Sequence, residues 1–105
     1  MRILFDQGVP VPLRRALTGH IVETAYERGW SNLSNGDLIR AAEPEFELFL
    51  TTDQNLRYQQ NLAGRTLAIL VLPTTRWPEI QANAVHVLAA VNAVQLGEYR
   101  ELKWE

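Results

Sequence analysis

One run of six apolar residues, 67–72, constrains the fold of this chain more than any other feature of its sequence. The run is bounded by Gly64 and Pro73, and its length is typical of a strand rather than of a helix. A strand with no alternating polar residues is apolar on both faces, as interior strands are in parallel sheets that helices cover on both sides. We therefore predict a parallel sheet with residues 67–72 in its interior.

Shorter strand and helix patterns alternate along the rest of the chain. Four further strands are expected, the last of them polar and at an edge of the sheet, at 2–5, 20–25, 47–51 and 99–104. Helical patterns separate them, beginning near Pro10, Ser34, Asp53 and Pro78. The alternation predicts one α/β domain over residues 1–105, with a mostly parallel sheet and helices on both faces.

The composition excludes several classes of protein. The chain has 105 residues, 47% of them hydrophobic and 21% charged, which is ordinary for one globular domain. It has no cysteine, so disulfides, iron–sulfur clusters, thiolate zinc sites and cysteine nucleophiles are excluded. No stretch approaches the roughly 20 apolar residues of a membrane span, and the first residues do not read as a secretory signal. We expect a cytoplasmic protein that makes no use of a membrane.

The net charge of −2 argues against a nucleic-acid binder that relies on bulk positive charge. The types of the charged residues are more informative. Nine of the ten basic residues are Arg, the better bidentate ligand for phosphate. Arg76 follows the 67–72 strand and is a candidate contact for a phosphate, while Arg57 and Tyr58 are candidates for binding RNA, with Tyr58 stacking on a base. The alternative for each is an exposed side chain on a loop or helix, or an Arg paired with an Asp.

Three aspartates fall where strands end or helices begin. Asp6 directly follows strand 2–5, Asp53 follows strand 47–51, and Asp37 lies in the first turn of an expected helix. Ligands of open parallel sheets bind beyond the carboxyl ends of the strands. If the helix that carries Asp37 begins on that side, the three carboxylates converge. Carboxylates without His or Cys are hard oxygen ligands that suit Mg²⁺ or Mn²⁺.

Each aspartate also has a purely structural interpretation. Asp6 begins an Asp-Gln-Gly sequence that is typical of a turn. Asp37 lies three residues after Ser34, which is the spacing of a capping box with Ser34 as the N-cap. Asp53 can cap the helix that follows it. Spacing alone leaves both interpretations open at all three positions.

Several segments taken together resemble the short PIN-like family, relatives of PIN-domain ribonucleases and toxin-type nucleases. The resemblance rests on Ile-Leu-Phe-Asp at 3–6, Leu-Ser-Asn-Gly-Asp at 33–37 and Leu-Thr-Thr-Asp-Gln-Asn-Leu at 50–56, and it extends over about the whole chain. It implies a PIN-like, three-layer α/β/α sandwich around the parallel sheet.

The same resemblance implies a metal-dependent endoribonuclease that hydrolyses RNA phosphodiesters at Asp6, Asp37 and Asp53, which bind Mg²⁺ or Mn²⁺. Its expected partners are RNA as substrate, an antitoxin protein if the chain is the toxin of a toxin–antitoxin pair, and a second copy of the chain in a homodimer. The sequence departs from the family at Gln7, where a second acid is common, and after Asn55, where a fourth acid is expected. These departures leave an alternative, a non-catalytic PIN-like module that binds protein or RNA.

Overall fold

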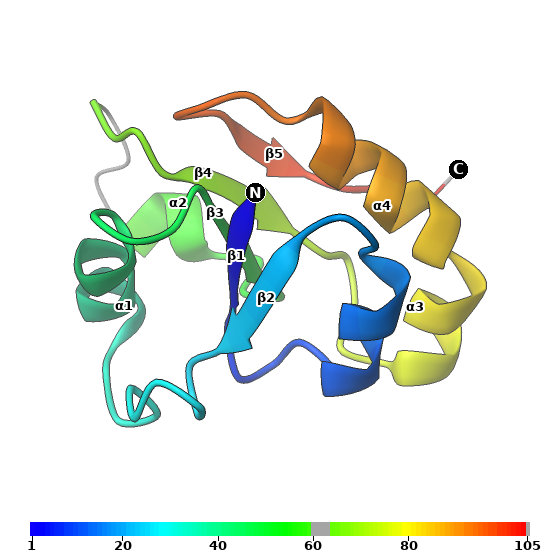
Figure 1. The fold of residues 1–105 in the computed structure, drawn as a ribbon, viewed down its shortest axis with the longest axis horizontal. Coiled ribbons are helices and arrows are strands. Elements are labelled where there is room, and N and C mark those ends of the chain that lie inside the picture. Colours follow the sequence, from blue (N-terminus) through cyan, green and yellow to red (C-terminus); the bar gives the residue numbers. More distant parts are fainter. Residues whose placement is uncertain (60–63, 105) are drawn as a thin grey trace.

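The computed structural model describes residues 1–59 and 64–104, and side chains at all of these positions except 58 and 59. Within them, the strands form one sheet in the order β2-β1-β3-β4-β5, and every neighbouring pair is parallel (Figure 1). The strands are β1 (Arg2–Phe5), β2 (Ile21–Thr24), β3 (Leu48–Thr51), β4 (Ala68–Val71) and β5 (Tyr99–Glu101). The α/β class with a parallel sheet, expected from the alternation of strand and helix patterns, is confirmed.

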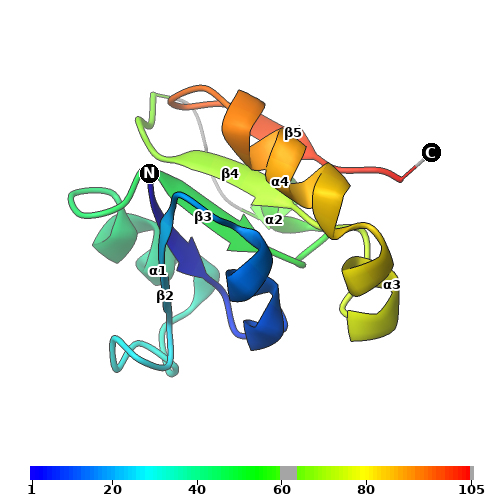
Figure 2. The ribbon, with the colours of Figure 1, turned by 45° about the vertical axis from the view of Figure 1, so that its right-hand side comes forward.

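The helices lie on both faces of this sheet (Figures 1 and 2). They are the 3₁₀ helix η1 (Val11–Ala16) and the α-helices α1 (Asn35–Ala42), α2 (Leu56–Gln59), α3 (Trp77–Ala82) and α4 (Ala84–Ala93). η1, α3 and α4 pack against one apolar cluster, and α1 and α2 against a second one. In the part of the chain that the structure describes, no helix is both long enough and apolar enough to cross a membrane.

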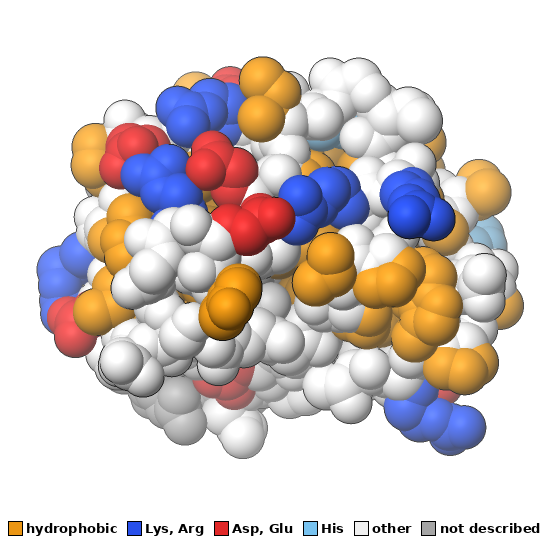
Figure 3. Space-filling model, turned by 60° about the horizontal axis from the view of Figure 1, so that its bottom comes forward, with side chains coloured by type: hydrophobic (Ala, Val, Ile, Leu, Met, Phe, Trp, Pro, Cys, Tyr) orange, Lys and Arg blue, Asp and Glu red, His pale blue; other side chains and the backbone are white. Residues whose placement is uncertain are grey.

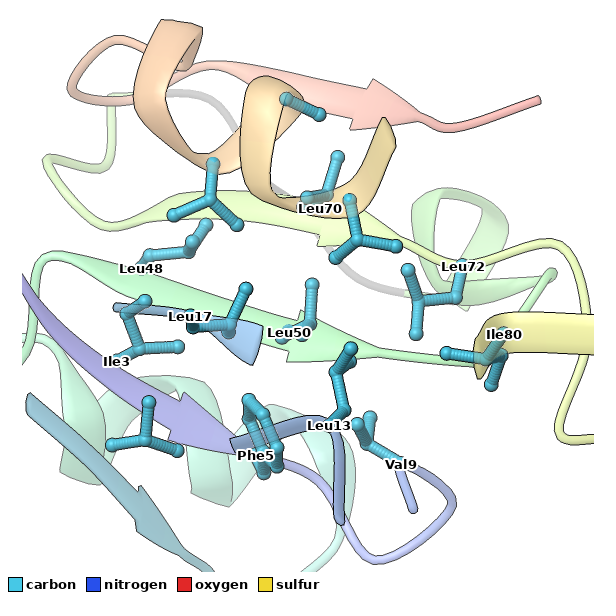
Figure 4. Close-up of a cluster of buried hydrophobic side chains, with 14 of the residues drawn as sticks. Ile3, Phe5, Val9, Leu13, Leu17, Leu48, Leu50, Leu70, Leu72 and Ile80 are labelled. Atoms are coloured by element: carbon cyan, nitrogen blue, oxygen red, sulfur yellow. The ribbon is translucent and has the colours of Figure 1, made fainter. Parts of the chain in front are cut away.

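Alternate side chains of the central strands supply the two clusters. Ile3, Leu48 and Leu70 point to the side of η1 and α4, where they pack around Phe5 and Leu13 (Figure 4). Their sequence neighbours, among them Leu4, Phe49 and Ile69, point to the side of α1 and α2. β4 lies between β3 and β5, and no residue from 67 to 72 is more than 2% exposed. The predicted interior strand, apolar on both faces, is confirmed.

Two helices differ from the expected form. The segment after Pro10 is a 3₁₀ helix, in which the Leu13 N–H donates to the Pro10 carbonyl at 3.1 Å. Short connectors commonly take this tighter form. The helix expected to run unbroken from Pro78 is divided into α3 and α4 at Asn83, which has φ −112° and ψ 17°. The Asn83 amide donates to the Glu79 carbonyl at 2.9 Å and so replaces part of the helical hydrogen bonding.

The remaining strand and turn expectations are met where the structure describes them. β5 is an edge strand, as the polar segment 99–104 predicts, and its residues are all half-buried. The segment after Asp53 forms the short helix α2, while Leu62, expected to anchor its end, lies outside the described residues.

Candidate functional site

The candidate site lies at the carboxyl edge of the sheet, between β1 and β3. β1 has β2 on one side and β3 on the other, so the chain leaves β1 toward one edge of the sheet and later returns to build the opposite edge. Such reversals of strand order open a crevice at the carboxyl ends of the strands, where ligands of parallel sheets bind. Asp6 directly follows β1, and Asp53 lies two residues beyond Thr51, the last residue of β3.

The hydroxyl of Thr51 joins the two aspartates. It donates to Oδ2 of Asp6 at 2.8 Å and accepts the backbone N–H of Asp53 at 3.1 Å. Thr51 is fully buried, because its strand is covered on both faces, so the hydroxyl has one fixed environment. The Asp6 N–H also donates to the Leu50 carbonyl at 2.9 Å, which extends the β1–β3 pairing to the site itself. The structure thus brings the Asp6 carboxylate and the Asp53 backbone together at one hydroxyl.

Asp53 is held by one further contact from a distant segment. The side-chain amide of Asn35, the first residue of α1, donates to Oδ2 of Asp53 at 2.6 Å. Oδ1 of Asp53 accepts the Asn55 N–H at 2.9 Å, which is the turn-capping role expected from its position before a helix. Oδ1 of Asp6 likewise accepts the Gln7 N–H at 2.7 Å. An ionised carboxylate has about four lone-pair sites, so these hydrogen bonds leave both groups able to accept another ligand.

Asp37 faces a different partner. Its carboxylate forms an ion pair with Arg40, three residues along the same helix, and both side chains are at least half exposed. Its backbone N–H donates to Oγ of Ser34 at 3.3 Å, so Ser34 is the N-cap that the spacing predicts. Among residues 1–59 and 64–104, no three His, Cys, Asp or Glu side chains are grouped so that they could hold a metal ion.

The other candidate residues are spread along the same edge of the sheet. Arg76 is exposed at the N-cap of α3. Arg57, on α2, forms an ion pair at 3.6 Å with Glu101, the last residue of β5. The side chain of Tyr58 lies outside the described residues. The pair with Glu101 leaves Arg57 less available to a phosphate than Arg76.

A hollow of about 600 Å³ adjoins Asp6 and lies over the ends of β1 and β2. Its lining includes the apolar Val11, the exposed ring of Tyr26 and the ion pair of Arg14 with Glu27. The Thr24 N–H and the Arg14 guanidinium both donate to Glu27 and lower the pKa of its carboxyl, so Glu27 is anionic at neutral pH. The volume is in the range of small-ligand pockets.

The comparisons with known proteins add no relative: no family model matches the chain, and neither a curated protein nor a solved structure matches it. The function therefore has to be argued from the geometry. Sequence reasoning identified Asp6 and Asp53 but missed Thr51 and Asn35, which orient them. A Thr at the end of an apolar strand, two residues before an Asp, is the signal that could have pointed to Thr51.

Proposed function

We propose that this protein is a Mg²⁺- or Mn²⁺-dependent endoribonuclease with a PIN-like, three-layer α/β/α fold. One observation carries the proposal: the buried Thr51 hydroxyl bonds both the carboxylate of Asp6 and the backbone of Asp53, at the place where a parallel sheet reverses its strand order. A structural turn at either residue needs no such link between them.

The donor set fits a hard divalent cation. Asp6 and Asp53 offer carboxylate oxygens, and the nearby Asn35 and Thr51 contribute only amide and hydroxyl groups. Mg²⁺ keeps several waters and is usually bound through one or two carboxylates together with substrate phosphates, so two acids suffice. A bound metal of this kind would polarise the phosphodiester and make a water molecule more acidic.

The chain's own residues have positioning roles in this proposal. Thr51 holds the Asp6 carboxylate in one orientation, and Asn35 does the same for Asp53. Asp37, paired with Arg40, enters as a third acid that acts through water. Because Asn35 touches Asp53, the start of α1, which also carries Asp37, lies beside the site.

Thermal melts with and without millimolar Mn²⁺ test the proposal. At a hundredfold excess over the dissociation constant, a bound metal stabilises the fold by about 2.7 kcal/mol, or roughly 10 °C for a domain of this size. Asp53→Asn keeps the turn cap, since Asn also caps well, but removes the stabilisation by Mn²⁺ and the cleavage of a fluorescent RNA. Asp37→Asn removes both only if Asp37 is a ligand. A wild-type protein that Mn²⁺ does not stabilise would overturn the metal site.

A second candidate function is a non-catalytic PIN-like module that binds protein or RNA. The observation that favours it is the ion pair of Asp37 with Arg40, which turns the third acid to a structural partner. Binding of RNA with no cleavage at any Mn²⁺ concentration would establish this function instead. An antitoxin that covers the acidic cleft, a homodimer and a cytoplasmic location are further parts of the proposal, and co-expression with the neighbouring gene product tests the first.

A further inference from the structure

The arginines of this chain divide into two groups. In the described part of the chain, every Arg other than Arg15 and Arg76 forms an ion pair with a Glu or Asp. Both exceptions are exposed, Arg15 on η1 and Arg76 at the N-cap of α3. The neutralised arginines leave these two as the guanidinium groups available to an anion.

Arg15 lines a groove that starts at Asp6, and Arg76 directly precedes Trp77, which lines the far end of that groove. The hollow beside Asp6 shares Val11, Arg14 and Glu27 with a second hollow of about 440 Å³. The second hollow in turn shares Pro12 and Arg15 with a third, of about 470 Å³, which reaches Trp77 on α3. We name the three together the η1 groove. Figure 3 views the molecule from the side toward which β1 and β2 run and shows hydrophobic side chains gathered there beside Arg and Lys side chains.

An aromatic ring lies near each end of the η1 groove. Tyr26 lines the hollow beside Asp6 and is 78% exposed, so its ring is accessible to a ligand. Trp77 lines the far hollow, directly after Arg76, and is half-buried against the core. Aromatic faces that alternate with arginines are the pattern of a surface on which successive bases stack while phosphates pair with guanidinium groups.

We propose that the η1 groove binds a single strand of nucleic acid, with phosphates on Arg15 and Arg76 and a base on Tyr26. The proposal rests on the proposed function, to which it adds the path of the substrate away from Asp6. The size of the groove favours a single strand: η1 has six residues and spans roughly 12 Å at about 2 Å per residue. Modules that bind double-stranded RNA contact about 16 base pairs, far more than this groove offers.

Fluorescence anisotropy with a labelled octauridylate in EDTA tests the groove without metal or cleavage. For single strands, the slope of log K against log salt falls by about 0.7 for each phosphate contact removed. We expect Arg15→Gln and Arg76→Gln each to lower the slope by about 0.7, and the double variant by about 1.4. Arg100→Gln removes the same charge from β5, where Arg100 pairs with Glu98, and leaves the slope unchanged.

Variants of Tyr26 provide a second part of the experiment, one that does not depend on charge. Tyr26→Ala weakens binding by roughly fivefold or more, because a stacked base is lost, whereas Tyr26→Phe keeps the affinity. An oligonucleotide in which every base is absent binds wild type and Tyr26→Ala equally.

Three results would overturn the proposed binding of a single strand in the groove. The first is a salt slope in both Arg variants equal to that of the wild type, and the second is duplex RNA that competes as well as single-stranded RNA does. The third is a polyglutamate peptide that displaces the oligonucleotide and whose own binding depends on Arg15. The last would indicate an acidic protein as the occupant. Cleavage with Mn²⁺ is measured separately on the wild type. Binding that follows the Arg and Tyr26 variants without any cleavage supports the groove and overturns the ribonuclease alone.

Discussion

The carboxylate of Glu43 links the end of α1 to the start of β4, and its removal tests how such a link contributes to stability. Oε2 accepts the N–H groups of Thr66 and Leu67 at 2.7 and 3.0 Å and the Thr66 hydroxyl at 3.1 Å. Arg65 pairs with Oε1 at 3.3 Å. One side chain therefore satisfies two backbone donors that no neighbouring strand reaches.

The expected cost of Glu43→Ala follows from which donors lose their partner. The Thr66 bonds are exposed, so water replaces most of their energy, while the bond to the Leu67 N–H is partly buried. A hydrogen bond to a charged group contributes about 1.5–3 kcal/mol. We expect a loss of about 2–3 kcal/mol, measured by urea denaturation at pH 7. Glu47→Ala, which removes a carboxylate with one exposed backbone bond to Arg2, should cost under about 1 kcal/mol.

The stability that the Glu43 carboxylate contributes should also depend on pH, in a direction that its pKa gives. The Leu67 N–H, and then the Thr66 N–H, lower the pKa of Glu43 in the folded protein from its ordinary value of 4.5, against the opposing effect of burial. A carboxyl whose folded pKa is lowered contributes stability above its unfolded pKa and loses it as the pH falls through the folded value. The difference in the free energy of unfolding between the wild type and Glu43→Gln should therefore have its full value at pH 7 and shrink below about pH 4.5. A difference that stays constant from pH 7 to pH 3 would refute this reasoning.

Two glycine substitutions test the packing of loops at the two ends of the sheet, both by urea denaturation. A methyl group on Gly8 would collide with the hydroxyl of Thr52, so Gly8→Ala should cost about 1–3 kcal/mol, and Thr52→Ala in the same chain should recover most of it. Equal costs in both backgrounds would show that the two loops do not touch. Gly97→Ala should cost more than about 2 kcal/mol, because φ is +75° and a Cβ would lie 2.6 Å from the Arg65 carbonyl. Gly19→Ala is the control, because Gly19 has φ +85° and open space around it, so its substitution carries only the conformational cost. Equal losses of stability in Gly19→Ala and Gly97→Ala would contradict a collision with the Arg65 carbonyl.

The sequence by itself determined the class of the fold and the edge of the sheet at which chemistry is expected. Residues 67–72 are apolar at every position, and their number and the bounding Gly64 and Pro73 favour a strand covered on both faces, which β4 is. Asp6 directly follows one strand pattern and Asp53 lies two residues beyond another, so a parallel sheet places them at the same edge without further information. Both inferences depend on short local strand patterns and on the direction of the chain, which sequence carries.

Tertiary structure alone decided the strand order, the division of the last helix and the partners of each acid. Asp37 satisfies the spacing of a site residue and of a capping box equally well, and only the position of Arg40 and Ser34 in space shows what it contacts. Asn35 and Asp53 meet although 18 residues separate them. The η1 groove depends on η1 lying beside α3, from segments about 60 residues apart. Such contacts arise because burying both faces of the sheet brings distant segments together, and no local pattern encodes which ones meet.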